Sequence, residues 1–123
     1  MWQSILLVAT GGGAGSVLRF LCQRWVHQHY PHAFPWGTFL VNIAGCLLIG
    51  LLWGLIEKGN LVKAEWRLLL VTGFCGGYTT FSSFAAENIQ LLKDGRITYF
   101  LFYSLASVLL GILAAFAGMM LTK

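Results

Sequence analysis

The residues best suited to chemistry lie in one stretch, 73–84 (GFCGGYTTFSSF), within a hydrophobic segment. Three glycines in five residues weaken a helix and allow unusual backbone dihedrals, and four Thr and Ser hydroxyls then compete for backbone hydrogen bonds. We therefore expect a helix break here. At membrane depth a break is tolerated only where protein buries it or where it lines a polar cavity. Freed carbonyls can hold a cation and helix N-termini can face an anion, so the stretch predicts ion handling inside a membrane.

Two aromatic residues, Phe81 and Phe84, follow the expected break three positions apart. Phenylalanine is among the residue types most often buried, so packing is its ordinary role. A ring edge is electropositive, however, and can contact an anion without the strong hydration of a lysine. Taken alone, the pair favours packing.

Polar side chains also occur inside the apolar segments on either side. The amide of Asn42 must find hydrogen-bond partners there. It could join neighbouring helices or act as a donor along a solvated path, and the sequence favours neither role over the other. Thr38 lies one turn earlier on the same face, which slightly favours a polar track.

A second track begins further along the chain. Tyr103 and Ser107 are four residues apart, so their hydroxyls share one helix face. The next positions on that face, Gly111 and Ala115, have no hydroxyl. Ser104 lies on another face, and we expect its hydroxyl to form a hydrogen bond with the backbone of its own helix.

Arg19 and Glu87 are the two charges deepest in the apolar segments, where charges pair or face water. Arg19 is expected either to attract anions into a vestibule or to cap a helix end. Glu87 would carry protons or cations in a transporter and would be structural in a channel. His27, His29 and His32 are expected in one solvated loop, since their spacing is loose for a metal site.

Composition places all of these residues in a membrane. The chain has 123 residues, 58% hydrophobic and only 10% charged, whereas a soluble domain carries about 25% charge. Apolar runs cover roughly 3–26, 36–56, 66–92 and 97–121, with breaks at 27–35, 57–65 and 93–96. Each run can cross a bilayer core, which needs about 20 residues. We expect an all-α membrane protein with a single transmembrane domain, 1–123. The first run lacks a preceding basic region and is too long for a signal peptide.

The basic residues fall near the ends of the runs, which favours lipid headgroups over nucleic acid as their partners. One side of the membrane would hold Lys58, Lys63, Arg67 and Lys123. The other would hold Arg24, Lys93, Arg96 and, if it reaches the interface, Arg19. Since Lys/Arg bias sets orientation, this near-balance favours insertion both ways and an antiparallel dimer. A single orientation with weak bias is the alternative.

Small residues and cysteines complete the pattern. Close helix packing is favoured by the glycine pairs 11/15 and 50/54, which are four residues apart, and by the small residues around Gly45. A bundle of only four short helices also favours oligomerisation. The cysteines have neither zinc-site nor disulfide spacing, so we expect buried free thiols. No nucleophile–base pair or metal-ligand set indicates an enzyme.

Three segments together resemble the Fluc fluoride channels, also called CrcB proteins. The segment 73–87 (GFCGGYTTFSSFAAE) is similar to their third-helix signature, 12–19 (GGAGSVLR) to their first-helix glycine–arginine motif, and 37–45 (GTFLVNIAG) to their second-helix motif. The likeness covers the whole chain, and the third-helix segment is the most specific.

The resemblance implies a fluoride-selective channel that exports fluoride passively across a bacterial inner membrane. It implies a dual-topology antiparallel homodimer with two fluoride pathways and a broken third helix. A central sodium ion would be held at the dimer interface by the backbone carbonyls of Gly76 and Thr79 from each subunit. The implied pathway residues are Asn42, Phe81, Phe84, Tyr103 and Ser107, with Arg19 in the vestibule, and Thr38 joins them by its helical spacing.

Tyr78, Ser83 and Gly111 depart from the family pattern, and Gly111 interrupts the polar track. The alternative function is a proton-coupled antiporter resembling the small multidrug resistance proteins. It would need a carboxylate at the membrane centre as an obligatory carrier, and Glu87 is its only candidate. A membrane assembly factor is a third class, which would leave the polar cluster at 73–84 without a role.

Overall fold

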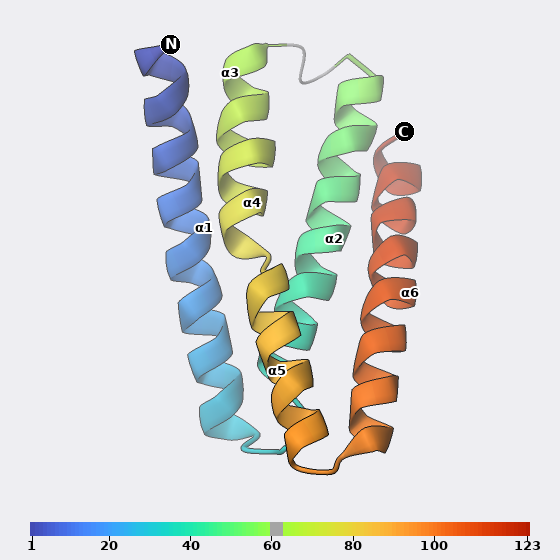
Figure 1. The fold of residues 1–123 in the computed structure, drawn as a ribbon. Helices are drawn as coiled ribbons and strands as arrows, with labels where there is room; N and C mark the ends of the chain where they lie inside the picture. Colours follow the sequence, from blue (N-terminus) through green and yellow to red (C-terminus); the bar gives the residue numbers. More distant parts are fainter. Residues whose placement is uncertain (60–62) are drawn as a thin grey trace.

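The computed structural model describes residues 1–59 and 63–123, and this part of the chain is all-helical (Figure 1). Four stretches are long and apolar enough to cross a membrane: Trp2–His29, Trp36–Glu57, Ala64–Lys93 and Ile97–Thr122. They confirm the four predicted spans, and their ends differ from the predicted ones by at most three residues. The first, second and fourth are the continuous helices α1 (Trp2–His29), α2 (Trp36–Glu57) and α6 (Ile97–Thr122).

The third span is assembled from four pieces. α3 (Ala64–Arg67) leads into the π-helical segment η1 (Leu68–Cys75), then the single turn α4 (Gly76–Tyr78) and finally α5 (Phe81–Lys93). Thr79 and Thr80, between α4 and α5, have extended backbones, with ψ of 157° and 120°. The Thr80 hydroxyl accepts a hydrogen bond from Ser83 N at 3.2 Å, which caps the first turn of α5.

The backbone departs from regular α-helix at different residues than the glycine pattern indicates. Gly76 is helical, with φ −63° and ψ −36°. The described glycines with positive φ are Gly59 and Gly95, in the turns after α2 and α5. The expectation of unusual glycine dihedrals within 73–84 is therefore wrong. Threonine takes the extended conformation instead, because β-branched side chains favour it.

The helices form two closely packed parallel pairs, each made of segments far apart in the sequence (Figure 1). In the first, α1 lies against η1 and α4, and a Cβ placed on Gly15 would collide with the Phe74 carbonyl. In the second, α2 lies against α6, and a Cβ on Gly50 would collide with the Ala115 carbonyl. Glycine is needed at both positions because backbones make contact there, the usual packing device in lipid.

The buried core lies in the half of the bundle that holds the α1–α2 and α5–α6 connections. Phe34, at the α1–α2 connection, is 3% exposed and packs its ring against several other aromatic rings. The neighbouring rings are those of Trp36, Phe39, Tyr99, Phe102 and Tyr103. The outer surfaces of the helices expose large apolar side chains, as expected where lipid replaces water.

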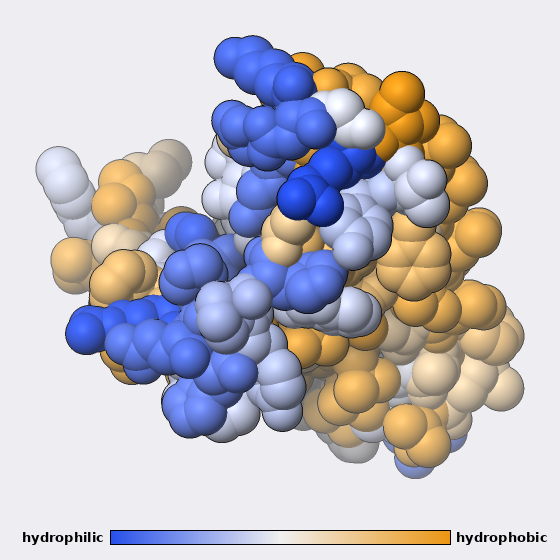
Figure 2. Space-filling view, turned by 90° about the horizontal axis from the view of Figure 1, so that it is seen from below, coloured by the Kyte–Doolittle hydropathy of each residue, from blue (hydrophilic) through white to orange (hydrophobic). Residues whose placement is uncertain are grey.

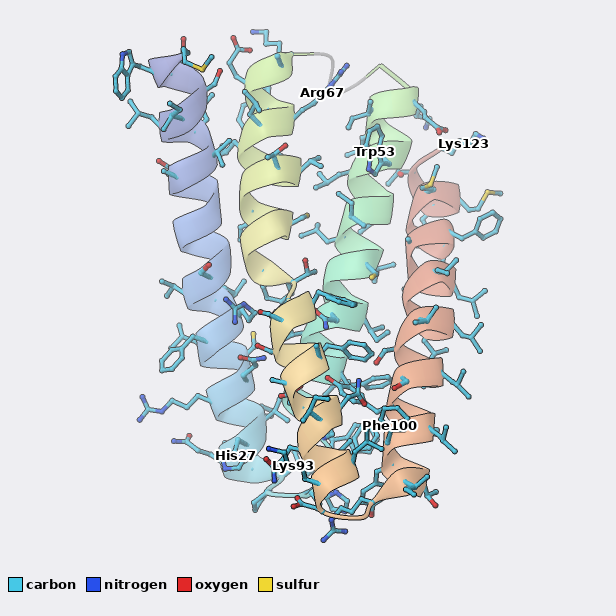
Figure 3. All side chains as sticks on the ribbon, in the orientation of Figure 1. His27, Trp53, Arg67, Lys93, Phe100 and Lys123 are labelled. Carbon is cyan, nitrogen blue, oxygen red and sulfur yellow. The ribbon has the colours of Figure 1, made fainter. Side chains whose placement is uncertain are left out.

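Charged residues gather at the two ends of the bundle. Figure 2 shows the hydrophilic side chains concentrated on the lower end, and Figure 3 places His27 and Lys93 there and Arg67 and Lys123 at the upper end. The predicted histidine loop is wrong in part, because α1 continues through His27 to His29. His29 stacks on Trp25 one turn earlier, with ring centroids 4.3 Å apart. The predicted connection 57–65 includes residues 60–62, which lie outside the described residues.

The close approach at Gly15 leads to a test of the first helix pair. Gly15→Ala should destabilise the fold by about 1–3 kcal/mol, because the new methyl group meets backbone that cannot move aside cheaply. Gly13→Ala is the matched control, since nothing in the described chain lies within 4 Å of a Cβ at that position on the same helix. Thermal unfolding in detergent, followed by circular dichroism, should show a lower midpoint for the Gly15 variant only. Equal midpoints would contradict the packing described here.

Candidate functional site

A cavity of about 460 Å³ lies between α2, η1, α4, the Thr79–Thr80 interruption, α5 and α6. We call it the central cavity. It brings together six of the residues predicted from the sequence: Asn42, Gly76, Thr79, Phe81, Phe84 and Ser107. Among the described residues, none of the side chains that line it is charged. The cavity can therefore offer an ion only neutral polar groups, backbone and ring edges.

Asn42 holds the interruption in place. Its Nδ2 donates to Thr80 O at 2.9 Å, and Thr80 N donates to its Oδ1 at 2.8 Å. One side chain thus replaces both partners that the backbone of Thr80 would have in a continuous helix. The amide group has two N–H donors, and only one of them donates a hydrogen bond within the described part of the chain. The two roles left open for Asn42 are therefore compatible, since it positions the backbone and keeps an N–H at the cavity wall.

The two phenylalanines lie at different depths. Phe84 is partly buried against Tyr103, with ring centroids 4.9 Å apart. Phe81 is 80% exposed, and its ring centroid is 5.7 Å from that of Phe84. The packing role fits Phe84 but does not explain Phe81, whose ring has almost no contact within its own chain.

Ser107 lines the central cavity and has a buried hydroxyl. Its Oγ is shielded from solvent and has no hydrogen-bond partner among residues 1–59 and 63–123. An unsatisfied buried hydroxyl costs free energy, so such groups in native structures call for an explanation. A ligand in the cavity that accepts a hydrogen bond from Ser107 would explain this hydroxyl.

The other predicted hydroxyls converge on Glu87. Tyr103, which is fully buried, donates to Glu87 Oε1 at 2.8 Å, and Thr38 donates to Oε2 at 2.7 Å. Gln23 in turn donates to Thr38 Oγ1 at 2.9 Å. Because both carboxylate oxygens accept, this arrangement suits the ionised form of Glu87. Thr38 and Tyr103 therefore do not line the central cavity, and their hydroxyl donors are engaged by Glu87.

Glu87 also lines a second cavity, of about 230 Å³, at the lower end of the bundle. This end cavity is more polar and includes Gln23, His27, His32 and Thr38. Gln23 was missed in the sequence, although an amide inside an apolar run is a signal of the kind that drew attention to Asn42. Ser104 was expected to bond its own helix, and instead it donates to Asn88 Oδ1 on α5 at 3.2 Å.

Arg19 lies beside the interruption and does not line either of these cavities. Its Nε donates to Gly77 O at 3.1 Å, and the Ser16 hydroxyl reaches the same oxygen at 3.4 Å. The two carbonyls predicted to hold sodium, those of Gly76 and Thr79, accept no hydrogen bond within the described chain, and neither does the carbonyl of Tyr78 between them. The neighbouring carbonyls of Cys75, Gly77 and Thr80 all have partners.

The four apolar spans define a multi-pass membrane protein, and beside its interrupted third span lies an uncharged, mainly apolar cavity with a few polar groups. Residues 6–119 match the family model described as CrcB-like protein, Camphor Resistance (CrcB). The chain belongs to this family, which confirms the resemblance found in the sequence.

Similar proteins from three bacteria support the same family assignment. The chain is 47% identical to a protein of Flavobacterium psychrophilum over 121 residues, which cover 98% of each chain. It is 49% identical to a protein of Bacteroides fragilis over 119 residues, covering 94% of this chain and 93% of the relative. It is also 46% identical to a protein of Pseudomonas putida over 119 residues, covering 97% and 96%. All three relatives are named fluoride-specific ion channel FluC.

The hydrogen bonds of Asn42 lead to a test of the interruption. Asn42→Leu keeps the approximate volume but removes both partners of the Thr80 backbone, and each buried group left unpaired costs about 1–3 kcal/mol. Hydrogen–deuterium exchange at residues 79–84 should become much faster. Asn88→Leu is the control, because it removes a side-chain bond and leaves the Thr80 backbone untouched. Unchanged exchange at 79–84 in the Asn42 variant would refute the role given to this amide.

Proposed function

We propose that this protein is a fluoride-selective channel that lets fluoride leave the cell passively across the bacterial inner membrane. The observation that carries the proposal is the central cavity, in which an unpartnered Ser107 hydroxyl, a spare N–H of Asn42 and two phenylalanine rings surround a space without charged side chains. The names of the relatives in three bacterial species support fluoride as the ion.

The chemistry of fluoride fits such a lining. Hydrogen fluoride is a weak acid whose neutral form crosses membranes and dissociates inside the cell, where the anion is trapped. An open path then suffices for export, since an inside-negative potential drives an anion outward with about 2.3 kcal/mol per charge per 100 mV. Fluoride is small and strongly hydrated, so the path must replace lost water with neutral donors. Selectivity against larger anions follows from width and donor geometry.

The antiporter alternative finds no support in the relatives, all of which are named as channels. The positions of the side chains also argue against it. A cation carrier needs a carboxylate in the transport cavity, whereas Glu87 does not line the central cavity and is held by Thr38 and Tyr103.

We propose further that the working unit is an antiparallel homodimer with two pathways. Three observations support a partner at the interruption. Phe81 lines the central cavity with a ring that is 80% exposed, so the ring is accessible to a partner subunit. Gly76 has nothing from the described chain within 4 Å of a Cβ position. The balance of Lys and Arg between the two ends also favours dual topology. A second copy across this face would cover Phe81 and complete the wall of the cavity.

Sodium is the cation proposed for the centre of this dimer. Within residues 1–59 and 63–123 the carbonyls of Gly76 and Thr79 accept no hydrogen bond, and neutral carbonyl oxygens suit a hard cation. Two carbonyls from each subunit would supply four ligands. The ion would offset the carbonyl dipoles at the interruption and link the two subunits, while the fluoride path itself uses only the donors of the central cavity.

Fluoride efflux from liposomes tests the function and the role of the rings. The wild type should release fluoride without a proton gradient. Phe81→Ile and Phe84→Ile should give folded protein with sharply lower flux, because an aliphatic side chain lacks the electropositive ring edge. A packing role predicts only a modest loss of stability, about 1 kcal/mol, with flux retained. Near wild-type flux in both variants would return the two residues to packing, and no fluoride release by the wild type would refute the function.

Two changes test the dimer and its sodium. Gly76→Leu adds a side chain where the single subunit has room, so it should leave the subunit helical but give monomers in size-exclusion chromatography. Gly13→Leu is the control, at an equally open position away from the interruption. Replacing sodium with N-methylglucamine should likewise weaken the wild-type dimer. If Gly76→Leu remains dimeric and sodium makes no difference, the interface lies elsewhere.

A further inference from the structure

The parallel pair α2–α6 has a regular register that relates its polar side chains. Gly50 lies against Ala115, and Gly54 lies against Met119 and Thr122, so residues on the face of α2 that contacts α6 lie near the residue of α6 that is 65 positions later. Cys46 and Gly111 obey the same rule, because a Cβ on Gly111 would lie 3.3 Å from Cys46 Sγ.

This register arranges the predicted polar residues in successive levels, four residues apart on each helix. Thr38 and Tyr103 form the first level and share Glu87. Asn42 and Ser107 form the second level and line the central cavity. Residues one turn apart on the same face are about 6 Å apart along the helix axis, a suitable spacing for successive positions of a small ion.

The third level is where the polar track on α6 stops, since Gly111 has no side chain. The structure places the thiol of Cys46 over this glycine, and Cys46 lines the central cavity together with Ser107. At the fourth level, Gly50 and Ala115 have no polar side chain, and their backbones are in contact. Cys46 is therefore the last polar side chain of α2 in the series that begins with Thr38.

We propose that the Cys46 thiol is the next hydrogen-bond donor for the anion beyond Ser107, on α2 in place of the hydroxyl that Gly111 does not provide. The inference rests on the proposed channel function and adds a pathway residue to it. A thiol is a weak donor, and it can serve where a neighbouring group shares the ion. Ser107 lines the same cavity, and its hydroxyl has no hydrogen-bond partner among the described residues, so a hydrogen-bond acceptor at this place would satisfy it.

The test separates a donor from a group that only fills space. Fluoride efflux is measured for the wild type, Cys46→Ser, Cys46→Ala and two double variants that pair Cys46→Ala with Gly111→Ser or Gly111→Ala. Removal of the sulfur makes room for a side chain at position 111 on the facing helix. Cys46→Ala should lower the initial rate by roughly tenfold, the value of one hydrogen bond to an ion.

Only a hydroxyl should restore the flux. Cys46→Ser and the double variant with Gly111→Ser should approach the wild-type rate, and the double variant with Gly111→Ala should stay slow. The proposal is overturned if Cys46→Ala conducts like the wild type, or if Gly111→Ala rescues as well as Gly111→Ser. A wild type that carries no fluoride would instead refute the proposed function itself, before any variant is compared.

A second measurement uses the unaltered protein and does not depend on the folding of variants. Methyl methanethiosulfonate modification of each cysteine is followed by mass spectrometry with and without fluoride. Fluoride should slow the modification of Cys46 and leave that of Cys22 unchanged, because Cys22 lines a different cavity, with Trp25 and Tyr78. Equal rates at Cys46 with and without fluoride would overturn the proposal.

Discussion

The hydrogen bonds between Asn42 and the backbone of Thr80 are the interaction on which the rest of the structure depends. In lipid, a helix that stops must find new partners for its N–H and C=O groups, and water is not available to supply them. One amide does this for Thr80, and Arg19 and Ser16 do it for the carbonyl of Gly77. With these groups satisfied, α5 can begin in a new place, so that Phe81 and Phe84 lie beside the central cavity.

The separation of charge from this cavity follows from the same arrangement. Glu87 lies on α5 on the side of the end cavity, where two hydroxyls satisfy its oxygens. The ring of Tyr103 contacts Phe84 while its hydroxyl contacts Glu87. A single aromatic residue therefore links the wall of the uncharged cavity to the carboxylate of Glu87.

The sequence predicted the spans because apolar runs of sufficient length have few alternatives, and it predicted the family because the stretch 73–87 is long and specific. It also selected six residues that do meet at the central cavity. It could not predict that Gln23 bonds Thr38 or that Cys46 lies over Gly111, because both contacts depend on the register between helices that are distant in the chain. The end of α1 was placed too early, since three nearby histidines suggested a solvated loop, whereas α1 continues through His29.

The pairing of the helices also has a consequence for biogenesis. Each of the two closely packed pairs joins segments separated by another span, so neither can form from a single hairpin as the chain enters the bilayer. The face of α2 that holds Gly50 and Gly54 has no partner until α6 has been inserted. During translation this face is exposed to lipid and to other nascent chains, and non-local pairing of this kind slows folding. Completion of the final span is therefore the step that turns four separate helices into one compact subunit.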